Sequence, residues 1–222
     1  MPPHYSQNKD ILPLTGGCPC GLIRYQISLP PLLVHCCYCT ACQRQTGSVL
    51  ALNAIVESTA VTLLPSTNSA VPGSISQPEP VATAASPAFA SITSAEALPQ
   101  APKLSAGTAA ICLPSQSGLG QTVVGCPDCR TGLWNHYADA GPHLSYVRVG
   151  TLDRPWEIEP DVHIYTSSRR SFLNVDDGKP SFEKYYPKRE ELLREDALDR
   201  HKALGPKIGE YWASMKGSLG SK

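Results

Sequence analysis

The stretch "GGCPCGLIRYQISL", residues 16–29, joins a close pair of cysteines to an alternating segment. Every second residue from Ile23 to Leu29 is apolar, and this period of two predicts a strand with one buried face. Cys18 and Cys20 precede the strand, and Gly21 suits a tight turn because glycine accepts positive φ without penalty. Two thiols at this spacing can converge on one metal ion. The stretch therefore predicts a β element organised around a metal.

A second pair of cysteines completes this site. The sequence "CPDC" supplies Cys126 and Cys129, and Pro127 stiffens the turn between them. Zinc prefers four tetrahedral ligands and binds thiolates at about 2.3 Å. The two pairs provide those four ligands, and a closed four-cysteine site is structural by default. Such a site would clamp segments that lie far apart in the chain.

A third group, Cys37, Cys39 and Cys42, finds no obvious fourth ligand. Cys112 lies in "AICLP", which forms no metal-binding turn. Cys36 adjoins Cys37, and adjacent residues on a strand point to opposite faces. We therefore expect that Cys36 does not bind the metal ion. Three protein ligands plus one open position is the general form of a catalytic zinc site. An open site of three thiolates favours a soft external ligand, a thiol, and would ionise it near neutral pH.

The sequence allows more than one role for each polar residue near these cysteines. Arg44 follows the third group and could meet a substrate carboxylate bidentately, or it could be an ordinary surface arginine. His35 could be a ligand, although a satisfied or exposed histidine fits the pattern better. His163 alternates with apolar neighbours, which favours a polar-face or supporting role. Arg44 is thus the candidate substrate-binding residue.

Composition restricts the partners and the compartment. The chain has 222 residues and a formal net charge of zero, so nothing indicates a nucleic-acid or membrane-surface partner. The first residues lack a charged region followed by an apolar core, and no run approaches the roughly 18 apolar residues of a membrane span. We therefore expect a cytoplasmic, reducing location, where nine cysteines favour metal binding over disulfides or a redox pair at 126–129.

Most of the chain has the pattern of short strands. Apolar, β-branched or alternating segments predict strands within residues 48–56, 60–64, 121–126, 132–138, 143–150 and 161–168. Residues 66–110 are mostly Ala, Ser, Pro and Thr, and such a segment buries too little apolar surface to offset its ordering entropy. We interpret it as a long disordered insertion, with an Ala-rich helix at 91–97 as the alternative.

The C-terminal part has a helical pattern instead. Leu193, Ala197 and Leu204 recur at helical spacing, and we expect the helix to end at Gly205-Pro206. The chain is thus predicted to be mainly β, with a long insertion and a C-terminal helix.

The ordered motifs resemble one known family. "GGCPCGLIRYQI", "CYCTACQRQTGS", "CPDCRTGLW" and "VGTLDRP…DVHIYTSSRRSFLNVDDGKPSF" follow one another as in the glutathione-dependent formaldehyde-activating enzyme (centromere protein V-like) family. The resemblance covers Leu14 to Pro187 apart from the insertion. It implies a domain at 14–187, interrupted at 66–110, and a helical tail at 188–222. It also implies an Mss4-like fold of small antiparallel sheets around zinc.

The resemblance further implies roles for the cysteines and an activity. The structural zinc would be held by Cys18, Cys20, Cys126 and Cys129. The second zinc, at which glutathione is thought to bind, would be held by Cys37, Cys39 and Cys42. The implied activity is reversible formation of S-(hydroxymethyl)glutathione from glutathione and formaldehyde, a carbon–sulfur lyase reaction. The implied partners are therefore a small-molecule thiol such as glutathione and a small carbonyl compound. Assembly into a homo-oligomer is an open alternative.

The chain departs from the family at Arg130 and Tyr38. Arg130 stands where the family usually has glycine, so we expect strain in that turn. Tyr38 stands where histidine is frequent. Two other functions remain open: a related enzyme acting on a different metabolite with the same zinc site, and a non-catalytic zinc-stabilised binding module.

Overall fold

The computed structural model describes residues 4–66, 107–115 and 118–219. The expected insertion at 66–110, with its alternative helix at 91–97, lies almost wholly outside the described residues. Ala109 and Ala110 are an exception, because they open strand β6 (Ala109–Leu113). The insertion therefore ends before Ala109. The expected domain limits, 14–187 and 188–222, remain a proposal.

The smaller of the two sheets contains the alternating strand. Its order is β1 (Leu14–Gly17), β2 (Arg24–Ile27) and β5 (Val61–Leu64), all antiparallel. The predicted buried face is confirmed for Ile23, Tyr25 and Ile27, which are 5% exposed or less. Leu29 lies beyond the strand and is 40% exposed. The alternation of buried residues therefore ends at Ile27 and not at Leu29.

The larger sheet has seven strands in the order β10-β3-β4-β9-β8-β7-β6. The ranges not yet given are β3 (Leu33–Cys37), β4 (Ala51–Glu57), β7 (Gln121–Gly125), β8 (Gly132–Tyr137), β9 (Leu144–Arg148) and β10 (Val162–Ile164). Neighbouring strands are antiparallel, except that β10 runs parallel to β3. The mainly β class is confirmed, and the parallel pair is a feature that the sequence did not indicate.

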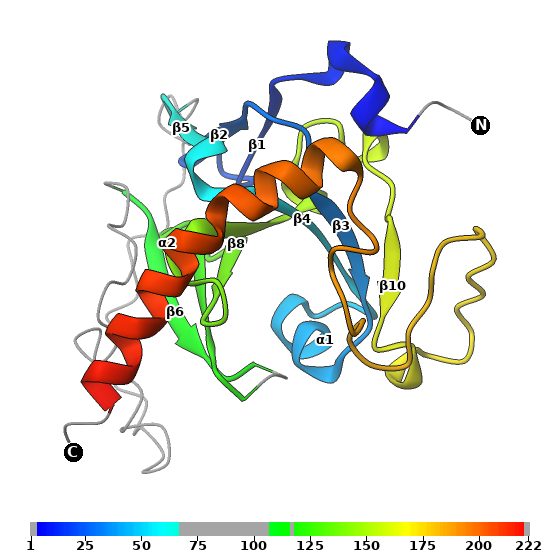
Figure 1. The fold of residues 1–222 in the computed structure, drawn as a ribbon. Coiled ribbons are helices and arrows are strands. Elements are labelled where there is room, and N and C mark those ends of the chain that lie inside the picture. The colour runs from blue at the N-terminus through cyan, green and yellow to red at the C-terminus, as the bar shows by residue number, and fades with distance from the viewer. Residues whose placement is uncertain (1–3, 67–106, 116–117, 220–222) are drawn as a thin grey trace, which may run out of the picture.

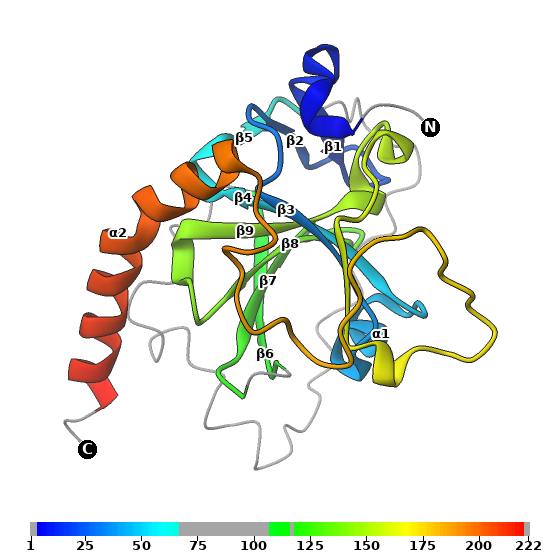
Figure 2. The same ribbon diagram turned by 45° about the vertical axis from the view of Figure 1, so that its right-hand side comes forward.

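The core lies on both faces of the larger sheet. The cross-strand row of Val34, Ala54 and Val147 packs with Tyr25 of the smaller sheet. The next row of Leu33, Ile55 and Tyr146 faces away from the smaller sheet and packs with Cys37, Cys39 and Cys42. Figures 1 and 2 show the smaller sheet at one end of the molecule and helix α1 (Thr40–Thr46) near the other end. The central strands therefore connect the two regions where cysteines gather.

Short 3-10 turns join many of these strands. They lie at Tyr5–Gln7, Lys9–Ile11, Ser58–Ala60, Gly141–His143, Val149–Thr151, Pro155–Glu157 and Thr166–Ser168. No helix within the described ranges is long and apolar enough to span a membrane.

The C-terminal helix is confirmed, but its predicted end at Gly205-Pro206 is wrong. Helix α2 runs over Glu195–Leu219 with Pro206 inside it. Proline lacks the N–H that would bond one turn back, which normally ends or kinks a helix. Tertiary packing outweighs this loss, because Ile208 packs against the core and Tyr211 is buried at Gly141. Figure 2 shows α2 along one side of the larger sheet.

Candidate metal centres

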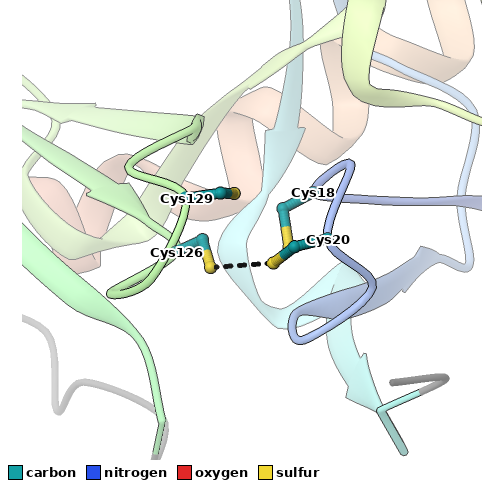
Figure 3. Close-up of side chains that lie close together, drawn as sticks. All are labelled: Cys18, Cys20, Cys126 and Cys129. Atoms are coloured by element: carbon teal, nitrogen blue, oxygen red, sulfur yellow. Dashed lines mark hydrogen bonds between the residues drawn. The ribbon is translucent and has the colours of Figure 1, made fainter. Parts of the chain in front are cut away.

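The first cysteine group joins two turns that lie far apart in the sequence. Cys18 and Cys20 follow β1, whereas Cys126 and Cys129 follow β7, and all four sulfur atoms lie within 4.8 Å of one another. The sulfur of Cys20 is 3.4 Å from that of Cys18 and 3.6 Å from that of Cys126 (Figure 3). Four thiolates around one zinc at about 2.3 Å would stand about 3.8 Å apart. The group therefore fits a tetrahedral zinc ion.

Backbone hydrogen bonds shape the first of these turns. The N–H of Cys18 donates to the carbonyl of Ile23 at 3.0 Å, and the N–H of Ile23 donates back to the Cys18 sulfur at 3.2 Å. Gly21 has a φ of 75°, which explains the glycine at this position. The turn thus presents its sulfurs to the opposite turn.

The expected strain at Arg130 is confirmed. Arg130 has a φ of 62°, in the left-handed region that favours glycine. The N–H of Cys126 donates to the carbonyl of Thr131 at 3.0 Å and closes the turn around it. The turn after Cys126 therefore holds an arginine in a backbone conformation that costs about 1 kcal/mol.

Arg130→Gly should therefore stabilise the protein by up to about 0.5 kcal/mol, because relief of about 1 kcal/mol of strain outweighs the added chain entropy of glycine. Chemical denaturation with parallel zinc analysis measures this. Arg169 is a matched control, since it is also exposed but has a φ of −65°. Arg169→Gly should not stabilise, and equal stabilisation by both changes would contradict the strain argument.

The second cysteine group forms where β3 ends and α1 begins. Cys37 is the last residue of β3, Cys39 is the N-cap of α1, and Cys42 lies in its first turn. The Cys39 sulfur accepts the N–H of Cys42 at 3.3 Å, so a thiol performs the capping that a serine or aspartate usually provides. All three side chains are buried, and their sulfurs lie within 4.8 Å of one another.

The chemistry of this donor set fits a metal cation. Hydrogen bonds from the thiols of Cys37 and Cys42 lower the pKa of Cys39 to about 3. The bond to Cys39, followed by that to Cys42 and by burial, raises the pKa of Cys37. Without a metal, the three buried thiols therefore accommodate one negative charge but not three. A soft dication would stabilise all three as thiolates.

A hydrogen-bonded chain supports the loop that carries these ligands. Tyr38, buried between Cys37 and Cys39 in the sequence, bonds through its hydroxyl to Nδ1 of His163 at 3.0 Å. Nε2 of His163 is 2.9 Å from a carboxylate oxygen of Asp177. His163 thus supports the loop of the three cysteines through Tyr38, as its polar-face pattern suggested, and belongs to neither cysteine group.

Arg148 supports α1 from the other side. Its guanidinium donates to Oδ1 of Asn53 at 2.5 Å and to Oε1 of Gln45 on α1. Arg148 is only 8% exposed, and no Asp or Glu in the described part of the chain pairs with it. The charge that it can best balance is that of the nearby Cys42. Arg148 therefore both anchors α1 and offsets negative charge at the second group.

A cavity of about 250 Å³ opens onto the second group. The cysteines line it together with His35, Ala41, Asn53, Gln121, Tyr137, Asp139, Tyr146, Ile164, Tyr165 and Tyr185. Besides the cysteines, the wall thus has four tyrosines, four polar side chains and two aliphatic residues. The sequence did not indicate this wall, because its residues come from separate strands and from the segment after β10.

The remaining candidates lie outside both groups. Cys36 is buried next to Cys37 but belongs to neither group, and Cys112 lies on β6 with its sulfur 3.8 Å from Oγ1 of Thr122. His35 lines the cavity, and its Nε2 is hydrogen bonded to the hydroxyl of Tyr186 at 2.8 Å. Arg44 is exposed on α1 and is not part of the cavity lining.

The fold and the sites define a mainly β protein with two cysteine groups that could each hold a zinc ion, one of them at a cavity. A family model described as glutathione-dependent formaldehyde-activating enzyme matches residues 13–84 and 82–168. The chain belongs to this family. The family is enzymatic, and membership supports a glutathione-related, formaldehyde-activating role. No curated protein matches the chain.

Proposed function

We propose that the chain is a zinc-dependent carbon–sulfur lyase that forms and cleaves S-(hydroxymethyl)glutathione from glutathione and formaldehyde. The observation that carries this proposal is the three-cysteine group at the cavity. No fourth cysteine, histidine or carboxylate joins it among the described residues. Zinc with three protein ligands keeps one position for an external ligand, which is the form of catalytic sites. Family membership supports glutathione and formaldehyde as the reactants.

Cys37, Cys39 and Cys42 would hold the zinc of this site. When bound, zinc supplies a position that takes up a thiol sulfur and lowers its pKa, so that a thiolate is available near neutral pH. The chain contributes by fixing the three sulfurs before the thiol arrives. The Tyr38–His163–Asp177 chain fixes the loop on one side, and Arg148 fixes α1 on the other.

The cavity favours a small carbonyl compound over a larger metabolite. Its volume of about 250 Å³ is at the low end for ligand pockets, which usually enclose about 300–1,000 Å³. It has room for the thiol end of a substrate and a small electrophile beside it. The rings of Tyr137, Tyr146 and Tyr185 form apolar walls that limit water near the sulfur.

The four-cysteine group has a structural role in this proposal. It takes all its ligands from two turns, which leaves no position for a substrate. None of its four residues lines the cavity at the second group. The four-cysteine group would thus stabilise the fold, and the three-cysteine group would serve catalysis.

Zinc analysis and exchange spectroscopy test the proposal. The purified protein should contain two zinc ions and should accelerate exchange between formaldehyde and S-(hydroxymethyl)glutathione, measured by NMR with ¹³C-formaldehyde. The uncatalysed rate must be subtracted, because this addition also occurs in water. Acceleration with another thiol alone would overturn glutathione as the substrate. Two bound zinc ions without any acceleration would favour the binding module.

A further inference from the structure

Tyr165 has an unusual backbone conformation beside the cavity. It follows β10 directly and has φ 57° and ψ 40°, in the left-handed region that aromatic residues rarely adopt. Two hydrogen bonds hold it there: its N–H donates to the carbonyl of Lys184, and its carbonyl accepts the N–H of Ser168, both at 3.0 Å. Strained residues that the surroundings hold in place are concentrated at functional sites.

This conformation directs the Tyr165 ring to the three-cysteine group. Tyr165 lines the same cavity as Cys37, Cys39 and Cys42. The phenol ring therefore borders the same space as the three sulfurs, where a molecule bound in the cavity would lie.

The Tyr165 hydroxyl differs from those of two neighbouring tyrosines. Arg189 donates to the hydroxyls of Tyr146 and Tyr185, and Tyr185 also bonds to the hydroxyl of Tyr186 at 2.8 Å. No residue that the structure describes forms a hydrogen bond with the hydroxyl of Tyr165. That hydroxyl is thus available to a molecule in the cavity.

Tyr137 is the rival candidate. It also lines the cavity, and its hydroxyl likewise has no partner within residues 4–66, 107–115 and 118–219. However, Tyr137 ends the regular strand β8 and shows no backbone strain. The fold therefore stores strain to place Tyr165 but not Tyr137.

We propose that Tyr165 is the catalytic acid–base residue of this site, an inference that rests on the proposed function. As the thiolate sulfur forms a bond to the carbonyl carbon, the π electrons of the C=O bond move to oxygen, and the Tyr165 hydroxyl donates its proton there. The proton that the thiol released on binding restores the phenol through solvent. The sum is a thiol plus a carbonyl compound giving a hemithioacetal. In cleavage, the Tyr165 phenolate takes the hydroxyl proton back.

Tyr165→Phe tests this assignment, because it keeps the ring and the strained backbone and removes only the hydroxyl. A general acid contributes about 10²–10⁴-fold. We expect kcat for the exchange reaction to fall about 100-fold after subtraction of the uncatalysed rate. KM, the glutathione affinity measured by calorimetry and the zinc content should stay within twofold of the unchanged protein.

Two further variants separate the outcomes. Tyr211→Phe removes the hydroxyl of a buried tyrosine whose ring lies at Gly141, outside the cavity, and should keep full exchange activity. Tyr137→Phe should reduce kcat less than Tyr165→Phe does. The assignment is overturned if Tyr165→Phe keeps kcat within twofold, if it loses zinc or glutathione binding, or if Tyr137→Phe has the larger effect. An unchanged protein without exchange above background would overturn the proposed function, and this assignment with it.

Discussion

Cys126→Ser should unfold the protein at room temperature. Cys126 belongs to the four-cysteine group, whose two halves lie 106 residues apart at the Cys20–Cys126 contact. Structural zinc sites bind with an apparent free energy of about 10–16 kcal/mol, whereas whole domains are stable by only about 5–15 kcal/mol. Loss of this clamp should therefore remove most of the stability. Far-UV circular dichroism during thermal denaturation, together with zinc analysis, measures the effect.

Cys112→Ser is the control for this prediction. Cys112 is a half-buried free cysteine on β6 and lies outside both groups. Serine there should change the free energy of unfolding by no more than about 1 kcal/mol. If Cys126→Ser melts within a few degrees of Cys112→Ser, the four-cysteine group has no structural role.

Cys39→Ser should abolish activity while the fold persists. The change removes a sulfur from the three-cysteine group, but serine is a good N-cap and can accept the N–H that Cys39 accepts now. Helix α1 should therefore form as before. We expect one zinc ion per chain instead of two, no glutathione binding in calorimetry, and exchange at the uncatalysed rate.

Cys36→Ser is the matched control for Cys39→Ser. Both thiols are buried close together in sequence, yet Cys36 belongs to neither group. Cys36→Ser should keep two zinc ions and nearly full exchange activity. A Cys39→Ser protein that keeps both ions and binds glutathione unchanged would contradict the proposed function.

Local periodicity explains which strands the sequence could predict. Strand β2 alternates because one of its faces packs against the larger sheet. Strand β3 gave no such signal, since all five of its residues are buried and its sequence has no period of two. Helix α1 was missed because it has only seven residues and a cysteine as its cap. In α2, packing of Ile208 and Tyr211 outweighed the proline signal.

The candidate site was predictable only in part for a similar reason. Each cysteine group contains short spacings that are visible along the chain, so the two sets could be separated by counting ligands. The cavity wall has no such signature. Tyr137, Tyr165 and Tyr185 come from β8, the end of β10 and a later loop, and only the folded topology brings them together. The unusual conformation of Tyr165 depends on tertiary hydrogen bonds, which no local pattern reveals.

The segment that holds Tyr185 has a consequence for the shape of the cavity. The family match ends at residue 168, but Tyr185 lines the cavity and Arg189 behind it bonds to the hydroxyls of Tyr146 and Tyr185. The matched residues therefore include all seven cysteines that could hold metal, while a segment after residue 168 completes the cavity wall. A protein with the same cysteine groups but a different segment after residue 168 would therefore have a different cavity wall.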